Sequence, residues 1–323
     1  MSALLEIDDL RVEFDQGGGV TSRALRGITL AVGAGEVVGV VGETGCGKTL
    51  TGLSVLRLLP KNARTTGSIT FDGVELTALS DRKLRELRGS AVSIVFQSPS
   101  TSFNPVFTVG RQLEQVARTH LGVARREATD VVQGALKEVG LPAPERIMQF
   151  YPHELSGGML QRAMIAMAIL CRPRLLIADE PTTALDVTVA QQILFLLRTL
   201  QREHGFGVLF ISHDLELVGD FCDRVAVLYA GRVVETGPAG ELLRRPRHPY
   251  TRALLNALPD RAQPRASLPT IPGGLPPLVG DEPPGCAFAE RCPLVVPRCL
   301  EVQPELEAVG DRRHSACHRR EDM

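Results

Sequence analysis

The octapeptide GETGCGKT occupies residues 42–49 and lies between an apolar run and a predicted helix. Its members are Gly42, Glu43, Thr44, Gly45, Cys46, Gly47, Lys48 and Thr49. The octapeptide fits the pattern G-x-x-x-x-G-K-[ST], with a buried strand predicted over 37–41 and a helix predicted from 49 to 60. Glycines let the backbone curl so that N–H groups face the β- and γ-phosphates, and the helix dipole adds partial positive charge. We therefore predict that the chain binds a nucleoside triphosphate.

Individual residues of this loop have distinct predicted roles. Lys48 would bridge the β- and γ-phosphates, and the Thr49 hydroxyl would ligate Mg²⁺. Leu50 completes the predicted nucleotide-binding set. Cys46 lies at a helix N-terminus, where the dipole favours the thiolate, so we expect a thiol that alkylation modifies and that bound ATP protects. The alternative for Cys46 is a small, shielded filler residue. For the loop as a whole the alternative is a glycine-rich turn with a solvated lysine, which the strand and helix context disfavours.

Composition excludes several classes of function. The chain has 323 residues with 36 basic and 37 acidic side chains, so no global field favours nucleic acid. Aromatic residues make up 4% and tryptophan is absent, which argues against stacking platforms for single strands. The N-terminus shows no signal-peptide pattern, and the longest apolar stretch, 163–171, is about half of a bilayer span. We expect a cytosolic chain whose membrane connection runs through a partner.

The order of patterns predicts an α/β fold with a mixed sheet. Strands are predicted at 5–14, 28–32, 67–73, 92–96, 175–178, 208–212 and in a hairpin around 225–234. Amphipathic helices at 112–120 and 124–139 indicate a helical subdomain of about 98–170. Beyond residue 237 prolines become frequent and the alternation of predicted strands and helices ends, which predicts an extended segment with little regular structure. We therefore divide the chain into a nucleotide-binding domain, 1–237, and a C-terminal extension, 238–323.

The segment LLIADE, residues 175–180, predicts a second part of the phosphate site. A strand end would deliver Asp179 to the Mg²⁺ shell, and Glu180 would polarise an attacking water. The alternative is a strand that simply ends in two solvated acids. After a phosphate loop, the catalytic interpretation is favoured.

The segment LSGGM, residues 155–159, decides the family. Together with Gln97, Ala184-Leu185-Asp186 and His213, in this order and spacing, it resembles the ATP-binding subunits of ABC transporters over about residues 5–240. The resemblance implies that Ser156, Gly157 and Gly158 contact the γ-phosphate held by a second subunit, which agrees with free N–H donors at a helix start. It also implies roles for five more residues: Gln97 at Mg²⁺ and water, Asp179 at Mg²⁺, Asp186 across the dimer interface, His213 at the γ-phosphate and Phe14 against adenine. Phe14 alternates with core positions, so a core role is the equal alternative.

Two further stretches resemble the peptide permeases within that family. RPRHPYTRALLNALP, residues 245–259, resembles their C-terminal extension, and TSFNPVFTVG with LSGGMLQRAMIAMAIL resembles their D-type ATPase. The resemblance implies an F-type ATP-binding partner, two transmembrane permease subunits and an extracytoplasmic substrate-binding protein, at the cytoplasmic face of the inner membrane. Residues 97–109 and the helices that follow are the expected docking surface. A nickel or other small-solute importer is the alternative, and a soluble ABC ATPase is less favoured because the chain has neither a second ATPase half nor a coiled-coil insertion.

Four cysteines crowd the end of the chain: Cys286, Cys292, Cys299 and Cys317, spaced C-x5-C-x6-C-x17-C. A reducing compartment disfavours disulfides, so a metal centre is expected first. Zinc sites usually pair ligands two to four residues apart, whereas a four-iron four-sulfur cluster takes four cysteines at wider spacings. The peptide-permease resemblance also implies such a cluster, in a structural role. Zinc, with His314 and His318 as spare ligands, and no metal at all are the alternatives.

Overall fold

The computed structural model describes residues 3–183, 185–258, 270–276, 279, 284–310 and 312–323. The chain divides into two compact units. Unit 1 consists of residues 1–4, 32–36 and 78–210, and unit 2 of residues 5–31, 37–77 and 211–323. Each unit is therefore assembled from segments that are distant in the sequence, and each is described by itself.

Unit 1 has three neighbouring strands that are mostly buried. The order is β8-β7-β6, with β6 (Val92–Val95) parallel to β7 (Leu175–Asp179) and β8 (Gly207–Ile211) on the other side of β7. All five residues of β7 are buried, as expected for a near-continuous apolar strand in a parallel sheet. This sheet places the acidic pair that ends LLIADE at a strand C-terminus.

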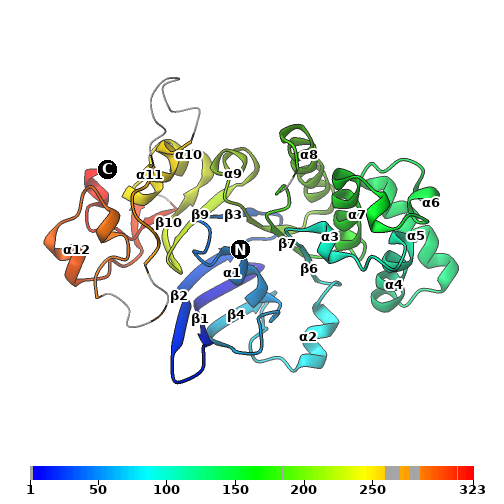
Figure 1. Ribbon diagram of the computed structural model, residues 1–323, viewed down its shortest axis with the longest axis horizontal. Coiled ribbons are helices and arrows are strands. Elements are labelled where there is room, and N and C mark those ends of the chain that lie inside the picture. Colours follow the sequence, from blue (N-terminus) through cyan, green and yellow to red (C-terminus); the bar gives the residue numbers. More distant parts are fainter. Residues whose placement is uncertain (1–2, 184, 259–269, 277–278, 280–283, 311) are drawn as a thin grey trace. The chain divides into compact units, whose positions relative to one another are not determined.

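Helices form the rest of unit 1. In Figure 1, α4, α5, α6 and α7 gather at one end of this unit, and contacts join α4 to α5 and α5 to α7. The helices of this unit are α2 (Asp81–Leu87), α3 (Pro99–Ser102), α4 (Val109–Leu121), α5 (Arg125–Glu138), α6 (Pro144–Ile147), α7 (Gly157–Ile169) and α8 (Val187–His204). The 3₁₀ turn η1 covers Pro152–Glu154. The helices predicted within 98–170 are thus confirmed.

Unit 2 contains a sheet of four strands in the order β2-β1-β4-β5, of which β2, β1 and β4 are labelled side by side in Figure 1. The strands are β1 (Leu5–Asp15), β2 (Thr21–Val32), β4 (Ala63–Phe71) and β5 (Val74–Glu75). The β4 strand begins earlier than predicted because Ala63 pairs with Phe14 at the far end of β1.

A second set of strands in unit 2 carries the phosphate loop and the C-terminal segment. The order is β3-β9-β10-β12-β11, parallel between β3 and β9 and antiparallel from β9 onward. These strands are β3 (Val37–Val41), β9 (Arg224–Tyr229), β10 (Arg232–Pro238), β12 (Arg313–Ser315) and β11 (Glu307–Gly310). Both strand orientations occur, so the mixed α/β fold predicted from the sequence is confirmed.

The helices of unit 2 show where sequence patterns were misleading. They are α1 (Lys48–Val55), α9 (Leu215–Phe221), α10 (Ala239–Arg244), α11 (Pro249–Asn256) and α12 (Pro297–Glu301), with 3₁₀ turns η3 (Ala289–Arg291) and η4 (Arg320–Asp322). The α1 helix stops before the predicted Pro60 because Arg57 takes a left-handed conformation, φ 48°. The prediction of little regular structure after residue 237 is wrong: α10 and α11 form, and β12 completes the open edge of β10. No helix in the described part of the chain is long and apolar enough to cross a bilayer.

Candidate functional site

The phosphate loop joins β3 to α1 in unit 2, and its curl requires glycine at two positions. Gly42 and Gly47 have φ of 151° and 110°, a region that side chains disfavour. A Cβ at Gly42 would lie 2.2 Å from the Leu228 carbonyl oxygen, and one at Gly47 would lie 2.4 Å from Leu25 Cδ2. Both glycines are therefore fixed by backbone conformation and by close packing.

Lys48 lies inside this curl. Its ammonium donates to the carbonyl oxygens of Gly42 at 2.8 Å and Glu43 at 3.2 Å, and the side chain is buried. Thr49 is exposed on the first turn of α1, where its hydroxyl suits a hard cation, while Thr44 and Gly45 are exposed on the loop. Leu50 is half-buried on the next position. The loop therefore offers a positive charge, N–H donors and a hydroxyl along one short segment.

The environment of Cys46 differs from the one expected for a reactive thiolate. Its side chain is buried, and burial raises the pKa of the thiol, outweighing the opposing effect of Lys48. A Cβ on Gly42 would come within 2.8 Å of Cys46 Sγ, so the sulfur packs against the loop backbone. The expected reactive thiolate is therefore wrong: Cys46 is the small, shielded filler.

Unit 1 brings Gln97 and Glu180 together, each just after a β-strand. Gln97 Nε2 donates to Glu180 Oε2 at 3.0 Å, and Thr183 Oγ1 donates to the same oxygen at 2.9 Å. Glu180 has φ 47°, uncommon for a side-chain-bearing residue and typical of functional sites. Asp179, one position earlier, is buried at the end of β7. A carboxylate held by an amide and a hydroxyl is a suitable group to orient water.

The signature segment begins α7 in unit 1. Ser156 is the N-cap, and its Oγ accepts from the Met159 N–H at 3.3 Å. Asp186 caps α8 in the same manner, accepting from the Val189 N–H at 3.0 Å. A Cβ on Gly158 would lie 2.9 Å from Val189 Cγ1, so the two helix starts pack closely and leave no space for a larger residue there.

The start of α7 is suited to an anion because Ser156 and Gly157 are exposed and the first N–H groups of a helix are donors, while Asp186 is exposed at the start of α8. Ala184, part of the motif that precedes Asp186, lies outside the described residues.

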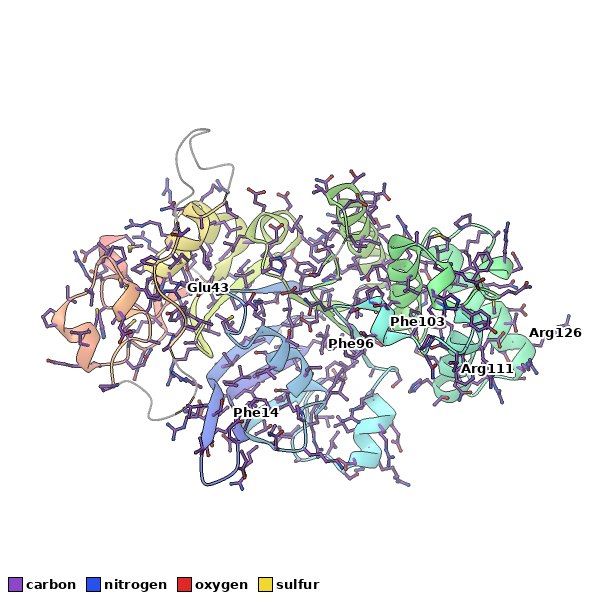
Figure 2. All side chains as sticks on the ribbon, in the orientation of Figure 1. Phe14, Glu43, Phe96, Phe103, Arg111 and Arg126 are labelled. Carbon is purple, nitrogen blue, oxygen red and sulfur yellow. The ribbon has the colours of Figure 1, made fainter. Side chains whose placement is uncertain are left out.

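Two predicted residues lie elsewhere in unit 2. His213 is exposed just after β8, where the neighbouring Asp214 caps α9 by accepting from the Glu216 and Leu217 N–H groups. Phe14 is half-buried on β1 and pairs with Ala63 of β4 (Figure 2). Its predicted contact with adenine stays a prediction.

The four C-terminal cysteines line one small cavity in unit 2, together with His248, Phe288 and His318. Cys286 N–H donates to the Cys299 carbonyl oxygen at 2.7 Å, and burial raises the pKa of the Cys286 thiol to about 11. Among the described residues, the only three candidate metal ligands with ligand atoms all within 4.8 Å of one another are Glu138, Glu203 and His204. The four cysteines therefore line the same cavity, but they are not among the groups whose ligand atoms all lie within 4.8 Å of one another.

The sequence patterns missed the residues that surround Glu43. Arg291 donates to both carboxylate oxygens of Glu43 at 2.8 Å, and the Tyr250 hydroxyl accepts from the Glu43 N–H at 2.9 Å. Tyr250 lies in the quoted stretch 245–259 and Arg291 between two of the cysteines, but neither position carries a pattern that indicates a partner 207 or 248 residues away.

A cavity of about 650 Å³ lies in the helical part of unit 1. Figure 2 marks Arg111, which lines it, with Phe103 and Arg126 on neighbouring elements. Its lining is polar and charged: Thr108, Gly110, Arg111, Glu114, Gln115, Arg118, Arg125, Thr129, Gln133, Glu145, Met148 and Gln149. Val106, on the loop before it, is 67% exposed. This hollow adjoins the segment expected to dock a partner.

Comparisons with known proteins agree with this geometry. The family model described as "ABC transporter" matches residues 25–183, and the one described as "Oligopeptide/dipeptide transporter, C-terminal region" matches residues 234–299. A probable peptide ABC transporter ATP-binding protein of Sinorhizobium fredii is 49% identical, covering 99% of this chain and 96% of that protein. The dipeptide transport ATP-binding protein DppD of Escherichia coli is 44% identical over 98% of this chain and 96% of its own length.

A solved structure of an ATP-binding cassette is also similar to this chain. It is a dimeric ATP-binding cassette in a post-hydrolysis state with ADP and phosphate bound. Its TM-score is 0.65 at 26% identity, and the match covers 73% of this chain and 98% of that one.

Proposed function

This chain belongs to the ATP-binding proteins of the ABC transporter family, and on that premise we propose that it hydrolyses ATP to drive the import of peptides through a membrane transporter. The observation that carries the proposal is the Gln97–Glu180 hydrogen bond at a strand end, in a chain that also has a complete phosphate loop. The peptide substrate rests on near full-length similarity to relatives named for peptide and dipeptide transport. Nickel and other small solutes are the alternative cargo.

Hydrolysis requires one water to attack the γ-phosphorus while the bond to the leaving ADP oxygen breaks. Glu180 would hold and polarise that water and take up its proton, and Gln97 would fix the orientation of the carboxylate. Lys48 would neutralise charge on the β- and γ-phosphates, and His213 would contact the γ-phosphate. Thr49 of unit 2, and Gln97 and Asp179 of unit 1, would each offer an oxygen donor to Mg²⁺, which would lower the charge on the phosphates.

The exposed start of α7 is the group we assign to a nucleotide held by another subunit. Ser156 and the following glycines present N–H donors to solvent, and Asp186 lies at the neighbouring helix start. We infer that the partner is a related F-type ATP-binding subunit. Co-expression with such a chain should give an ATP-dependent heterodimer, and formation of only homodimers with full turnover would contradict this assignment.

The hollow lined by α4 and α5 residues is the surface we assign to the two permease subunits. Its polar and charged lining and the exposed Val106 suit a short amphipathic segment of a membrane protein. Attachment there would place the chain peripherally at the cytoplasmic face of the membrane. Arg118→Glu should release the chain from membranes that contain the permease, whereas Arg82→Glu, an exposed change on α2 away from this hollow, should not.

A four-iron four-sulfur cluster is the cofactor we assign to the cysteine cavity. Supporting it are four free thiols that line one cavity and a sequence spacing wider than the ligand pairs of zinc sites. Cys286, Cys292, Cys299 and Cys317 would each bind one iron, and the group would hold loops together in a structural role. Anaerobically purified protein should be brown and lose colour in Cys292→Ser. Colourless protein with one zinc per chain would overturn the cluster.

Transport itself is the decisive test. The chain, its F-type partner, the permease subunits and an extracytoplasmic binding protein should be reconstituted in proteoliposomes. We expect ATP-dependent uptake of radiolabelled dipeptide or oligopeptide that stops with Glu180→Gln. Uptake of Ni²⁺ but not peptide would establish the alternative cargo. An ATPase that never co-purifies with permease subunits would favour a soluble ABC ATPase.

A further inference from the structure

Arg291 connects the C-terminal extension to the phosphate loop within unit 2. Its two terminal nitrogens each donate to one oxygen of the Glu43 carboxylate at 2.8 Å, a bidentate geometry that is stronger and more specific than a single contact. Its Nε donates to the Pro272 carbonyl oxygen at 2.7 Å, and Nη1 also donates to the Tyr229 hydroxyl at 3.2 Å. Arg291 thus holds three segments that are distant in the sequence.

These contacts are shielded from water. The Arg291 side chain is 7% exposed and that of Glu43 is 26% exposed. Beneath them Tyr229, Tyr250 and Phe288 form an aromatic cluster with centroid separations of 4.5 to 5.4 Å. A bidentate ion pair built on a rigid aromatic base differs from a mobile surface pair, which contributes little.

A second contact fixes the backbone at the same residue. The Glu43 N–H donates to the Tyr250 hydroxyl at 2.9 Å, and Tyr250 is fully buried. Leu275 Cδ1 would lie 3.6 Å from a Cβ on Gly45, so the extension also approaches the middle of the loop. Glu43, the second residue of the loop, is therefore held at both its side chain and its backbone by residues beyond position 245.

Neutralisation of the Glu43 carboxylate by Arg291 bears directly on nucleotide binding. Glu43 follows Gly42 in a loop whose predicted ligand is a polyphosphate, and an unpaired carboxylate there would repel it. Arg291 neutralises that carboxylate and directs it toward the extension. Because the Glu43 carboxylate is paired with Arg291, it does not offset the positive charge of Lys48, whose ammonium donates to the Gly42 and Glu43 carbonyl oxygens.

We propose that Arg291 is a positioning residue for nucleotide binding: it neutralises Glu43 and fixes this second residue of the phosphate loop, so that the C-terminal extension is part of the nucleotide site. The proposal rests on the proposed function, since it assumes that the loop binds ATP. It assigns to the extension a role that is independent of any metal bound by the neighbouring cysteines.

The test measures the dissociation constant for MgATP on the full-length chain. Arg291→Ala should weaken binding by roughly two- to thirty-fold, the range for changes in a contact network that does not touch ligand. Arg291→Lys, which keeps the charge but not the fork, should have an intermediate effect. Tyr250→Phe removes one hydroxyl but keeps the ring, and should weaken binding less than Arg291→Ala.

A double substitution separates positioning from simple loss of structure. The double variant Arg291→Ala, Glu43→Gln has no unpaired carboxylate in the loop. It should therefore bind MgATP more tightly than Arg291→Ala alone. Arg298→Ala, an exposed arginine of α12, is the matched control and should bind MgATP like the unmodified chain.

Three outcomes overturn the proposal: unchanged affinity in a folded Arg291→Ala variant, no recovery in the double variant, or an equal loss in Arg298→Ala. If Arg291→Ala does not fold, Arg291→Lys and Tyr250→Phe decide by the same measurement. Failure of the unmodified chain to bind MgATP would instead count against the proposed function.

Discussion

The predicted chemical groups of unit 1 and those of unit 2 are held in opposite ways. In unit 1, Gln97, Ser156 and Asp186 are exposed at strand and helix ends; Ser156 and Asp186 are oriented by helix-cap hydrogen bonds three residues away, and Gln97 by its bond to Glu180. In unit 2, the phosphate loop is backed by buried side chains, and the Tyr250 hydroxyl contacts it from 207 residues away in the sequence. Substitutions in unit 1 should therefore change chemistry with little effect on folding, whereas those in unit 2 should affect both.

The largest effect is expected at Glu180 in unit 1. Glu180→Gln removes the carboxylate that polarises water but keeps a side chain of the same shape, so turnover in the assembled transporter should fall by about 100- to 10,000-fold. Nucleotide binding should persist and the dimer should remain closed on ATP. Steady-state ATPase assays and gel filtration with ATP measure the two effects.

Glu203→Gln, at an exposed position of α8, is the control for Glu180→Gln and should keep normal turnover. A Glu180→Gln variant with unmodified turnover would show that the hydrogen-bonded pair of unit 1 is not the catalytic group.

The next effect is a pH dependence of stability in unit 2. Burial lowers the pKa of His248 from 6.5 to about 4. The unfolded chain therefore takes up a proton below pH 6.5 that the folded chain refuses, so stability is full above pH 6.5 and falls as the pH falls toward 4. From pH 7 to pH 4 the free energy of unfolding should drop by about 3 kcal/mol through this group.

Chemical denaturation of the unmodified chain and of His248→Gln at several pH values isolates this contribution. Glu235, whose pKa burial raises, acts in the opposite direction in both proteins and cancels in the difference. His153→Gln, at an exposed position, should follow the unmodified chain. Identical pH curves for the unmodified chain and His248→Gln would contradict the burial effect.

The contrast between the units also explains what the sequence could predict. The octapeptide, LLIADE and LSGGM are contiguous, so their residue types and spacing already specify strand ends and helix caps, and the structure places Gln97 beside Glu180. The Arg291–Glu43 pair joins residues 248 positions apart. No periodicity records such a pair, and a single sequence cannot show which of its many arginines meets a given carboxylate.

Besides pairs of residues that are distant in the sequence, the burial of single side chains could not be predicted from the sequence. The helix start that carries Cys46 favours its thiolate, whereas burial in the folded chain, which no local pattern shows, raises the pKa of the thiol. The regular elements after residue 237 were missed for a similar reason. The β12 strand has only three residues, and pairing with β10 rather than its own pattern makes it a strand.

A smaller effect is expected for Lys48→Ala in unit 2. Loss of a charge-assisted contact to the phosphates should weaken MgATP binding by about 10- to 100-fold. Because Lys48 is buried and bonded to two loop carbonyls, the midpoint of thermal unfolding should also shift. Lys61→Ala, at an exposed position after α1, is the matched control. Normal stability with weakened binding would show that the loop is less dependent on its buried lysine than the comparison between units implies.

The smallest effect is expected for thiol reagents at Cys46. Only the thiolate reacts, and burial both raises the pKa of this thiol and blocks approach to the sulfur. Cys171, which is half-buried in unit 1, should therefore be alkylated first in the folded chain, although burial raises its pKa as well. Peptide mass spectrometry after brief iodoacetamide treatment, with and without urea, gives the order of labelling. Cys46→Ser should bind MgATP normally because it keeps the small volume. Labelling of Cys46 as fast as Cys171 in the folded chain, with protection by ATP, would mean that the phosphate loop opens far more readily than the contacts of Arg291 and Tyr250 allow.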